Sequence, residues 1–85
     1  VTKPTPAMLE AMFNVPVGDD VFEEDPSITA FQKRVADLAG HEAGMFCASG
    51  TMSNQLGIRT HLLAPPYSVI CDSLAHVHSS EAGGI

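Results

Sequence analysis

The sequence predicts an α/β fold, because two short apolar segments of strand length flank a segment with the pattern of a helix. The apolar segments are residues 44–48 and 68–72, and residues 50–63 between them read as a capped helix. A strand, a helix and a second strand within about 30 residues match the size of a βαβ unit. In sheets of such units, ligands bind beyond the carboxyl ends of the strands. We therefore expect residues 49–51 and 72–78, which follow the two strands, to face one crevice.

Two helices are predicted ahead of this unit, and each has a recognisable start. Thr5 is suited to cap a short helix over residues 6–14, which begins with a proline. Asp25, also followed by a proline, starts a second helix over residues 26–39, and the glycine after it is a clear stop. Residues 17–24, between the two helices, are predicted to form an acidic loop. Apolar residues recur at helical spacing within the second helix: Ile28, Phe31, Val35 and Leu38.

Charge and composition restrict the classes of partner. The formal net charge is −6, with ten Asp and Glu against four Lys and Arg, which argues against nucleic acid and anionic membranes as partners. The acidic residues between positions 19 and 25 lack the alternation of a calcium-binding loop and are predicted to be solvated. Neither end has the pattern of a signal peptide or of a domain terminus, so we expect a piece of a larger cytoplasmic protein. Cys47 and Cys71 lie in apolar segments and are expected to be reduced and buried.

The start of the third predicted helix has the residues of an anion-binding turn. Ser49 is a good helix cap, Gly50 lets a ligand approach the backbone, and Thr51 adds a hydroxyl beside free N–H groups. A phosphate could accept hydrogen bonds here without any lysine or arginine. An ordinary capped helix after a strand fits the same spacing, so the pattern alone leaves both interpretations open.

The histidines differ in what they suggest. His41 and His61 lie near helix ends or on a helix surface, where no special role is expected. His76 and His78 follow a predicted strand, so His76 is a candidate for stacking on a planar cofactor or for acid–base chemistry. A zinc site completed by a cysteine or by Glu81 stays an alternative, but strand alternation would separate the two histidine side chains, and we predict no metal.

Four blocks of the sequence form one pattern when they are taken together. In chain order they are Val1-Thr2-Lys3-Pro4-Thr5; Val17-Gly18-Asp19-Asp20-Val21-Phe22 with Glu24-Asp25-Pro26; Phe46 with Ser49-Gly50-Thr51-Met52 and Asn54-Gln55; and Ala75-His76 with Glu81-Ala82-Gly83-Gly84. In this order and with these approximate spacings, they resemble the amino-terminal part of the threonine aldolases. Those are pyridoxal-phosphate enzymes of the aspartate-aminotransferase-like transferase fold, known as fold type I. The resemblance divides the chain into an arm with its acidic loop, residues 1–25, and the start of the large cofactor-binding domain, residues 26–85.

The resemblance implies roles for individual residues. Ser49, Gly50 and Thr51 match the turn that binds the phosphate of pyridoxal 5′-phosphate. His76 matches the histidine that stacks on the pyridine ring and takes part in proton transfer at the substrate. Glu81 matches a position close behind that histidine and is expected at most to support it. The implied reaction is cleavage of the Cα–Cβ bond of L-threonine or a related β-hydroxy-α-amino acid, which yields glycine and an aldehyde.

The sequence also departs from the family pattern. Phe22 stands where a tyrosine is common and Glu23 where a glycine is usual, so a hydroxyl contact from that loop is not expected. Neither Lys3 nor Lys33 matches the lysine that binds the cofactor covalently. The family places that lysine, the aspartate that pairs with the pyridine nitrogen and the arginine that binds the substrate carboxylate beyond residue 85. We therefore expect these 85 residues alone to be inactive.

The resemblance implies a carbon–carbon lyase of threonine catabolism and glycine biosynthesis. Its expected partners are an amino-acid substrate and further copies of itself in a dimer or tetramer. An amino-acid racemase of the same fold, such as an alanine racemase, is the first alternative, because removal of a Cα proton would use the same cofactor and the same histidine position. A β-eliminating lyase is a weaker rival. The alternative that is not an enzyme is a binding or structural module without a cofactor that has kept the four sequence blocks.

Overall fold

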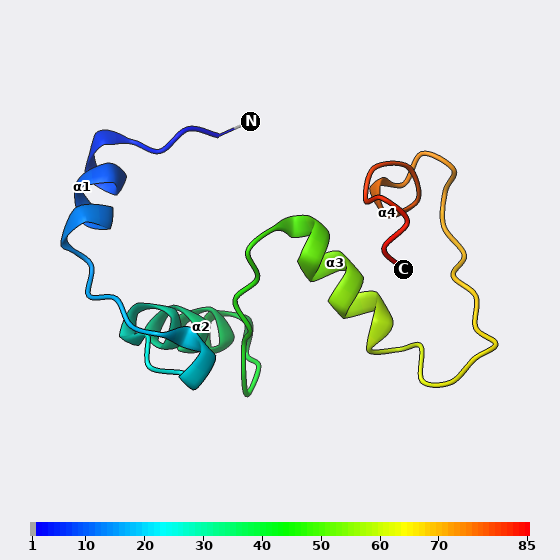
Figure 1. The fold of residues 1–85 in the computed structure, drawn as a ribbon, viewed down its shortest axis with the longest axis horizontal. Coiled ribbons are helices and arrows are strands. Elements are labelled where there is room, and N and C mark those ends of the chain that lie inside the picture. Colours follow the sequence, from blue (N-terminus) through cyan, green and yellow to red (C-terminus); the bar gives the residue numbers. More distant parts are fainter. Residues whose placement is uncertain (1) are drawn as a thin grey trace. The chain divides into compact units, whose positions relative to one another are not determined.

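A computed structural model of the chain describes residues 2–85, and that part is built of helices and connecting segments without a strand (Figure 1). The elements are α1 (Pro6–Asn14), the 3₁₀ helix η1 (Asp20–Phe22), α2 (Pro26–Ala39), α3 (Gly50–Arg59) and α4 (His76–Ser79). They belong to two compact units, one up to Phe46 and the other Cys47–Ile85, which are described separately. Val1, which opens the first block of the resemblance, lies outside the described residues.

Helix α1 has the bounds that its sequence predicts. The Thr5 hydroxyl accepts a hydrogen bond from the backbone N–H of Met8 at 3.3 Å, and the Met8 sulfur accepts from the N–H of Thr5 at 3.4 Å. Pro6 occupies the first turn, where a missing N–H costs nothing. No residue of α1 is buried, and Phe13 is 91% exposed. Local capping rather than packing therefore sets the limits of this helix.

Helix α2 also begins and ends where its capping residues predict. Asp25 is buried, and its Oδ1 accepts from the N–H groups of Ser27 at 2.9 Å and Ile28 at 3.0 Å. Its Oδ2 accepts from the N–H of Gly18 at 3.1 Å, which ties the acidic loop to the helix start. These backbone donors, Ile28 first and Gly18 next, hold the pKa of Asp25 below its ordinary value against the opposing effect of burial. Gly40 ends the helix in the left-handed conformation, with φ at 71°.

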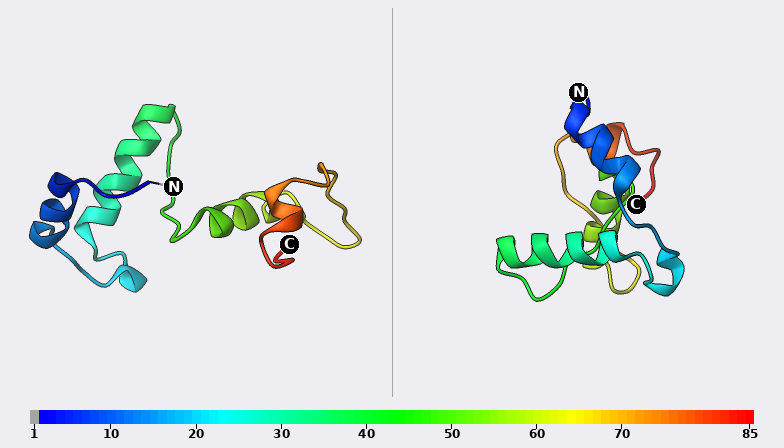
Figure 2. Two further views of the ribbon diagram at one scale, coloured as in Figure 1. Left: turned by 90° about the horizontal axis from the view of Figure 1, so that it is seen from above. Right: turned by 90° about the vertical axis from the view of Figure 1, so that its left-hand side faces the viewer.

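The segment after α2 folds back against that helix (Figure 2). The backbone N–H of Phe46 donates to the side-chain carbonyl of Gln32 at 2.7 Å, and its ring meets Phe31 edge-on with centroids 6.3 Å apart. Gly44 lies so close to the backbone carbonyl of Gln32 that a Cβ there would be only 2.9 Å from the oxygen. Ala36, on the same side of α2, is the one buried apolar residue among residues 2–85.

The predicted strands at residues 44–48 and 68–72 are absent from the described part of the chain, so the α/β prediction is wrong for it. A strand persists only when its backbone N–H and C=O groups pair with a neighbouring strand. Here the Phe46 N–H bonds to a side chain of α2 instead, and Ile70 is 99% exposed. The apolar pattern at these two segments indicates that their side chains favour burial. It does not provide strands to pair with, and residues 2–85 contain none.

Other predictions for the second half need smaller corrections. Helix α3 ends at Arg59 and not at residue 63, and residues 76–79, expected to be loop, form the short helix α4. Asp72 starts the turn before α4, because its Oδ1 accepts from the N–H of Leu74 at 2.7 Å. Both cysteines are free thiols as expected, but Cys71 is exposed and Cys47 only half-buried, since no sheet covers them. None of the helices in the described range has both the length and the apolar character needed to cross a membrane.

Two glycines offer a matched test of this local structure. A Cβ at Gly18 would collide with the backbone carbonyl of Glu24, whereas one at Gly57, within α3, would meet no atom within 4 Å. We expect Gly18→Ala to lower the free energy of unfolding of the full-length protein by about 1–3 kcal/mol. Gly57→Ala should raise it by about 0.5–1 kcal/mol, because alanine loses less backbone entropy in a helix. Urea denaturation measures both, and equal effects of the same sign would contradict the loop geometry.

Candidate functional site

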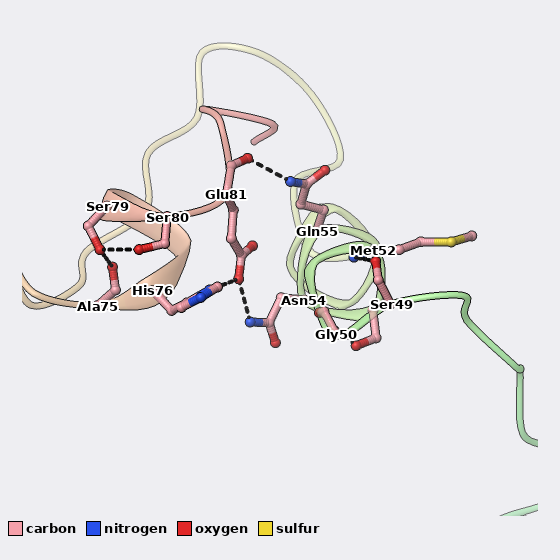
Figure 3. A network of polar contacts seen from close by, with 11 residues as sticks. Ser49, Gly50, Met52, Asn54, Gln55, Ala75, His76, Ser79, Ser80 and Glu81 are labelled. Atoms are coloured by element: carbon pink, nitrogen blue, oxygen red, sulfur yellow. Dashed lines mark hydrogen bonds and ion pairs between the residues drawn. The ribbon is translucent and has the colours of Figure 1, made fainter. Parts of the chain in front are cut away.

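The first turn of α3 presents unused hydrogen-bond donors. Ser49 caps the helix in an extended conformation, and its Oγ accepts from the N–H of Met52 at 3.1 Å (Figure 3). Its carbonyl accepts from the N–H of Ser53 at 3.1 Å. Helix geometry leaves the N–H groups of Gly50 and Thr51 without an acceptor inside the helix. A Cβ built at Gly50 would have no other atom within 4 Å, so the space beside this residue is open. An anion can therefore approach these two N–H donors and the hydroxyls of Ser49 and Thr51.

The side chain of Glu81 links α3 to α4 (Figure 3). Its Oε1 accepts from Asn54 Nδ2 at 2.8 Å and faces His76 Nδ1 at 2.9 Å. Its backbone carbonyl accepts from Gln55 Nε2 at 3.0 Å. Glu81 is only 2% exposed, so a carboxylate that usually lies in water is here enclosed by polar side chains from α3 and α4.

Electrostatics decide which nitrogen of His76 carries a proton. The hydrogen bond from His76 and then that from Asn54 lower the pKa of Glu81 below its ordinary value, although burial opposes them. Glu81 is therefore ionised near neutral pH and can only accept hydrogen bonds. His76 Nδ1 must then carry a hydrogen, which leaves Nε2 of the neutral ring with the free lone pair. The His76 side chain is 66% exposed, so Nε2 and the ring remain accessible.

The Glu81 carboxylate is not fully paired within the described residues. Its Oε2 is buried and has no hydrogen-bond partner among them. A buried carboxylate oxygen without a hydrogen-bond donor is unfavourable. The two hydrogen bonds to Oε1 and the one to the backbone carbonyl of Glu81 must therefore stabilise the buried position of this side chain. The network should accordingly be sensitive to the loss of any one of its donors.

The structure places all four predicted site residues in the same unit. Ser49, Gly50 and Thr51 form the start of α3, and His76 begins α4, which lies in contact with α3. His76 reaches α3 through Glu81 and Asn54, one turn beyond the N-terminal donors. The candidate anion-binding turn at the start of α3 and His76 on α4 are thus connected through Asn54 and Glu81, and helices rather than strand ends position them.

Sequence reasoning missed the roles of two amides. Asn54 and Gln55 entered only as part of the family pattern, whereas Glu81 was expected at most to support His76. The sequence shows only two neighbouring amides in the second turn of a capped helix. It does not reveal that both bind Glu81, which lies 27 residues after Asn54 and 26 after Gln55. Among residues 2–85, no group of three or more His, Cys, Asp or Glu side chains is arranged to hold a metal ion.

A cavity of about 330 Å³ in the same unit does not involve these residues. It is lined by Tyr67, Ser68, Val69, Cys71, Val77, His78, Gly83 and Ile85. Three of these eight residues belong to the segment predicted as a strand, and the others come from α4 and the segments on either side. We place the candidate ligand site at the start of α3 and not in this cavity.

The family model for beta-eliminating lyases matches residues 1–85, which is the whole chain. The chain belongs to the beta-eliminating lyase family. It is 52% identical over 84 residues to the low-specificity L-threonine aldolase of Eremothecium gossypii and 51% identical over 84 residues to that of Saccharomyces cerevisiae. The alanine racemase TOXG of Cochliobolus carbonum is 39% identical over 84 residues.

These relatives are much longer than the chain. Each match covers 99% of the chain but only 22% of the relative. Membership of the family confirms the resemblance drawn from the four sequence blocks and assigns the chain to a family of pyridoxal-phosphate enzymes. It also shows that aldolases and a racemase share this region.

The depressed pKa of Glu81 predicts how acid affects stability. A carboxyl group whose folded-state pKa lies below its ordinary value of 4.5 stabilises the fold above that value. The contribution is lost as the pH falls through the folded-state pKa. We expect the stability difference between the full-length protein and its Glu81→Gln variant to shrink as the pH is lowered from 6 to about 3. Urea unfolding at each pH measures this difference, and one that grows in acid would contradict the ionised, hydrogen-bonded carboxylate.

Proposed function

We propose that the full-length protein uses pyridoxal 5′-phosphate to cleave L-threonine and related β-hydroxy-α-amino acids to glycine and an aldehyde. The observation that carries the proposal is the link from His76, at the start of α4, through Glu81 and Asn54 to α3, the helix that begins after Ser49 with Gly50 and Thr51. The choice of reaction is supported by the identity of about half the residues to low-specificity L-threonine aldolases.

The residues at the start of α3 fit a phosphate group. The backbone N–H groups of Gly50 and Thr51 are free donors at the positive end of the helix dipole. The Thr51 hydroxyl and the hydrogen of the Ser49 hydroxyl, whose oxygen already accepts from Met52, supply two more donors. Four donors around an open glycine suit a dianionic phosphate without a cationic side chain. Ser49, Gly50 and Thr51 would hold the phosphate end of the cofactor.

His76 would serve the chemistry at the other end of the cofactor. Its exposed ring can stack on the planar pyridine, and its Nε2 lone pair can accept the proton of the substrate's β-hydroxyl. As that proton leaves, the hydroxyl carbon becomes an aldehyde carbonyl and the Cα–Cβ bond breaks. When bound, pyridoxal phosphate takes up the electron pair that this bond leaves on Cα. The residues of this chain contribute orientation and the base.

Alanine racemisation is the second candidate, and a specific observation favours it. TOXG, an alanine racemase, is 39% identical over 84 residues and covers the same region. The geometry of His76 suits removal of a proton from Cα as well as from a β-hydroxyl. The full-length protein is further proposed, on the family resemblance, to be a cytoplasmic homo-oligomer, a dimer or tetramer.

The products distinguish the two reactions. We expect full-length protein loaded with pyridoxal phosphate to release glycine and acetaldehyde from L-threonine, and not to form D-alanine from L-alanine. Chiral amino-acid analysis measures both reactions. His76→Asn should lower kcat for glycine release at least about 100-fold, whereas the matched control His78→Asn on the same short helix should have little effect. D-alanine without glycine would replace the aldolase with a racemase.

Cofactor affinity tests the phosphate site. Thr51→Val removes one hydroxyl donor and keeps the shape of the side chain, so the Kd for pyridoxal phosphate should rise about tenfold. Thr60→Val, the same substitution at the other end of α3, removes a hydroxyl that donates to the Gly57 carbonyl at 2.7 Å. We expect it to leave the Kd unchanged, because Thr60 lies at the negative end of the helix. Absorbance titration of the full-length protein measures both values, and equal Kd values for Thr51→Val and wild type would contradict the site.

A further inference from the structure

Two neighbouring amides of α3 bind the same residue in different ways. Asn54 Nδ2 donates to the carboxylate of Glu81 at 2.8 Å, and Gln55 Nε2 donates to its backbone carbonyl at 3.0 Å. The carboxylate oxygen that Asn54 binds is also the one that faces His76, at 2.9 Å. Gln55 therefore positions the backbone of Glu81, and Asn54 positions its side-chain carboxylate.

We propose that Asn54 is a positioning residue for His76 that acts through Glu81, holding the carboxylate against Nδ1 so that Nε2 keeps its lone pair. The inference rests on the proposed function in assigning Nε2 a task at the substrate. It goes beyond that function in assigning the control of the histidine to a residue of the phosphate-binding helix.

The donor set explains why an amide is needed at position 54. Glu81 Oε1 is an ionised acceptor with room for two donors, and Asn54 and His76 provide them. Oε2 has no hydrogen-bond partner among the described residues. Without the Asn54 donor, one bond from a largely exposed ring would hold the carboxylate, and rotation of the Glu81 side chain would release Nδ1. A free imidazole then exchanges its proton between the two nitrogens.

The position of Asn54 also connects the two ends of the proposed site. It lies four residues after Gly50, so the two share one face of α3. A phosphate held at the first turn and a histidine held at the second turn would keep a fixed separation, because the intervening helix is rigid. Glu81 is the charged group bonded to His76 in the described part of the chain, and the α3 face against it carries the neutral amides of Asn54 and Gln55.

The test uses matched leucine variants of the full-length protein without cofactor. Asn54→Leu keeps the approximate shape of asparagine and removes the donor, and Gln55→Leu removes the neighbouring donor to the same residue. Nitrogen-15 NMR with labelled histidine distinguishes a protonated ring nitrogen from one with a lone pair, and His76→Asn identifies the His76 signals. We expect His76 to carry its hydrogen on Nδ1 in wild type and in Gln55→Leu, and to become a mixture of the two tautomers in Asn54→Leu. Asn54→Ala, a second variant, should show the same mixture if the leucine variant does not fold.

Kinetics provide a second readout in the loaded enzyme. Asn54→Leu should lower kcat on the order of tenfold with little change in KM and alter the pH profile of kcat, whereas Gln55→Leu should keep the wild-type pH profile. An Nε2–H tautomer in wild type, or equal effects of the two leucine variants on the tautomer, would overturn the proposal. Failure of the wild type to release glycine would reject the proposed reaction but not the tautomer assignment, which is measured without cofactor or substrate.

Discussion

The buried carboxylate of Glu81 is the interaction on which the second unit of this protein depends. Enclosing an ionised carboxylate is unfavourable unless donors replace the lost water. Here the donors come from two elements, Asn54 on α3 and His76 on α4, and Gln55 binds the backbone of the same residue. In a unit whose large apolar side chains are mostly exposed, these polar bonds and not an apolar core hold the two helices together.

In the proposed site, helix α3 has two roles, one at its first turn and one at its second turn. Its first turn, capped by Ser49 and open at Gly50, presents free backbone donors at the positive end of the helix dipole. Its second turn holds Glu81, and through Glu81 the orientation and protonation of His76. A helix that binds the phosphate of a cofactor at one end and directs a base beside it would fix the reacting groups without a contribution from flexible loops.

The helix ends that carry a capping residue could be predicted from sequence because capping is local, whereas the end of α3 and the short helix α4 were not predicted. Thr5, Asp25, Ser49 and Gly40 act on backbone groups within a few residues, and the structure confirms each of these caps. The strands could not be predicted correctly, because pairing requires partners that no local pattern supplies. Residue chemistry and the family pattern predicted the anion-binding turn and a role for His76, and both stay predictions. The bonds from Asn54 and Gln55 to Glu81 were missed because they join residues 27 and 26 positions apart.

The most direct test is a crystal structure of the full-length protein with pyridoxal phosphate bound. The account predicts a phosphate oxygen within hydrogen-bond distance of the N–H groups of Gly50 and Thr51, and the His76 ring against the pyridine. It also predicts that Glu81 stays bonded to both His76 Nδ1 and Asn54. A phosphate bound elsewhere, or a Glu81 side chain turned away from His76, would contradict the assignment of both tasks to α3.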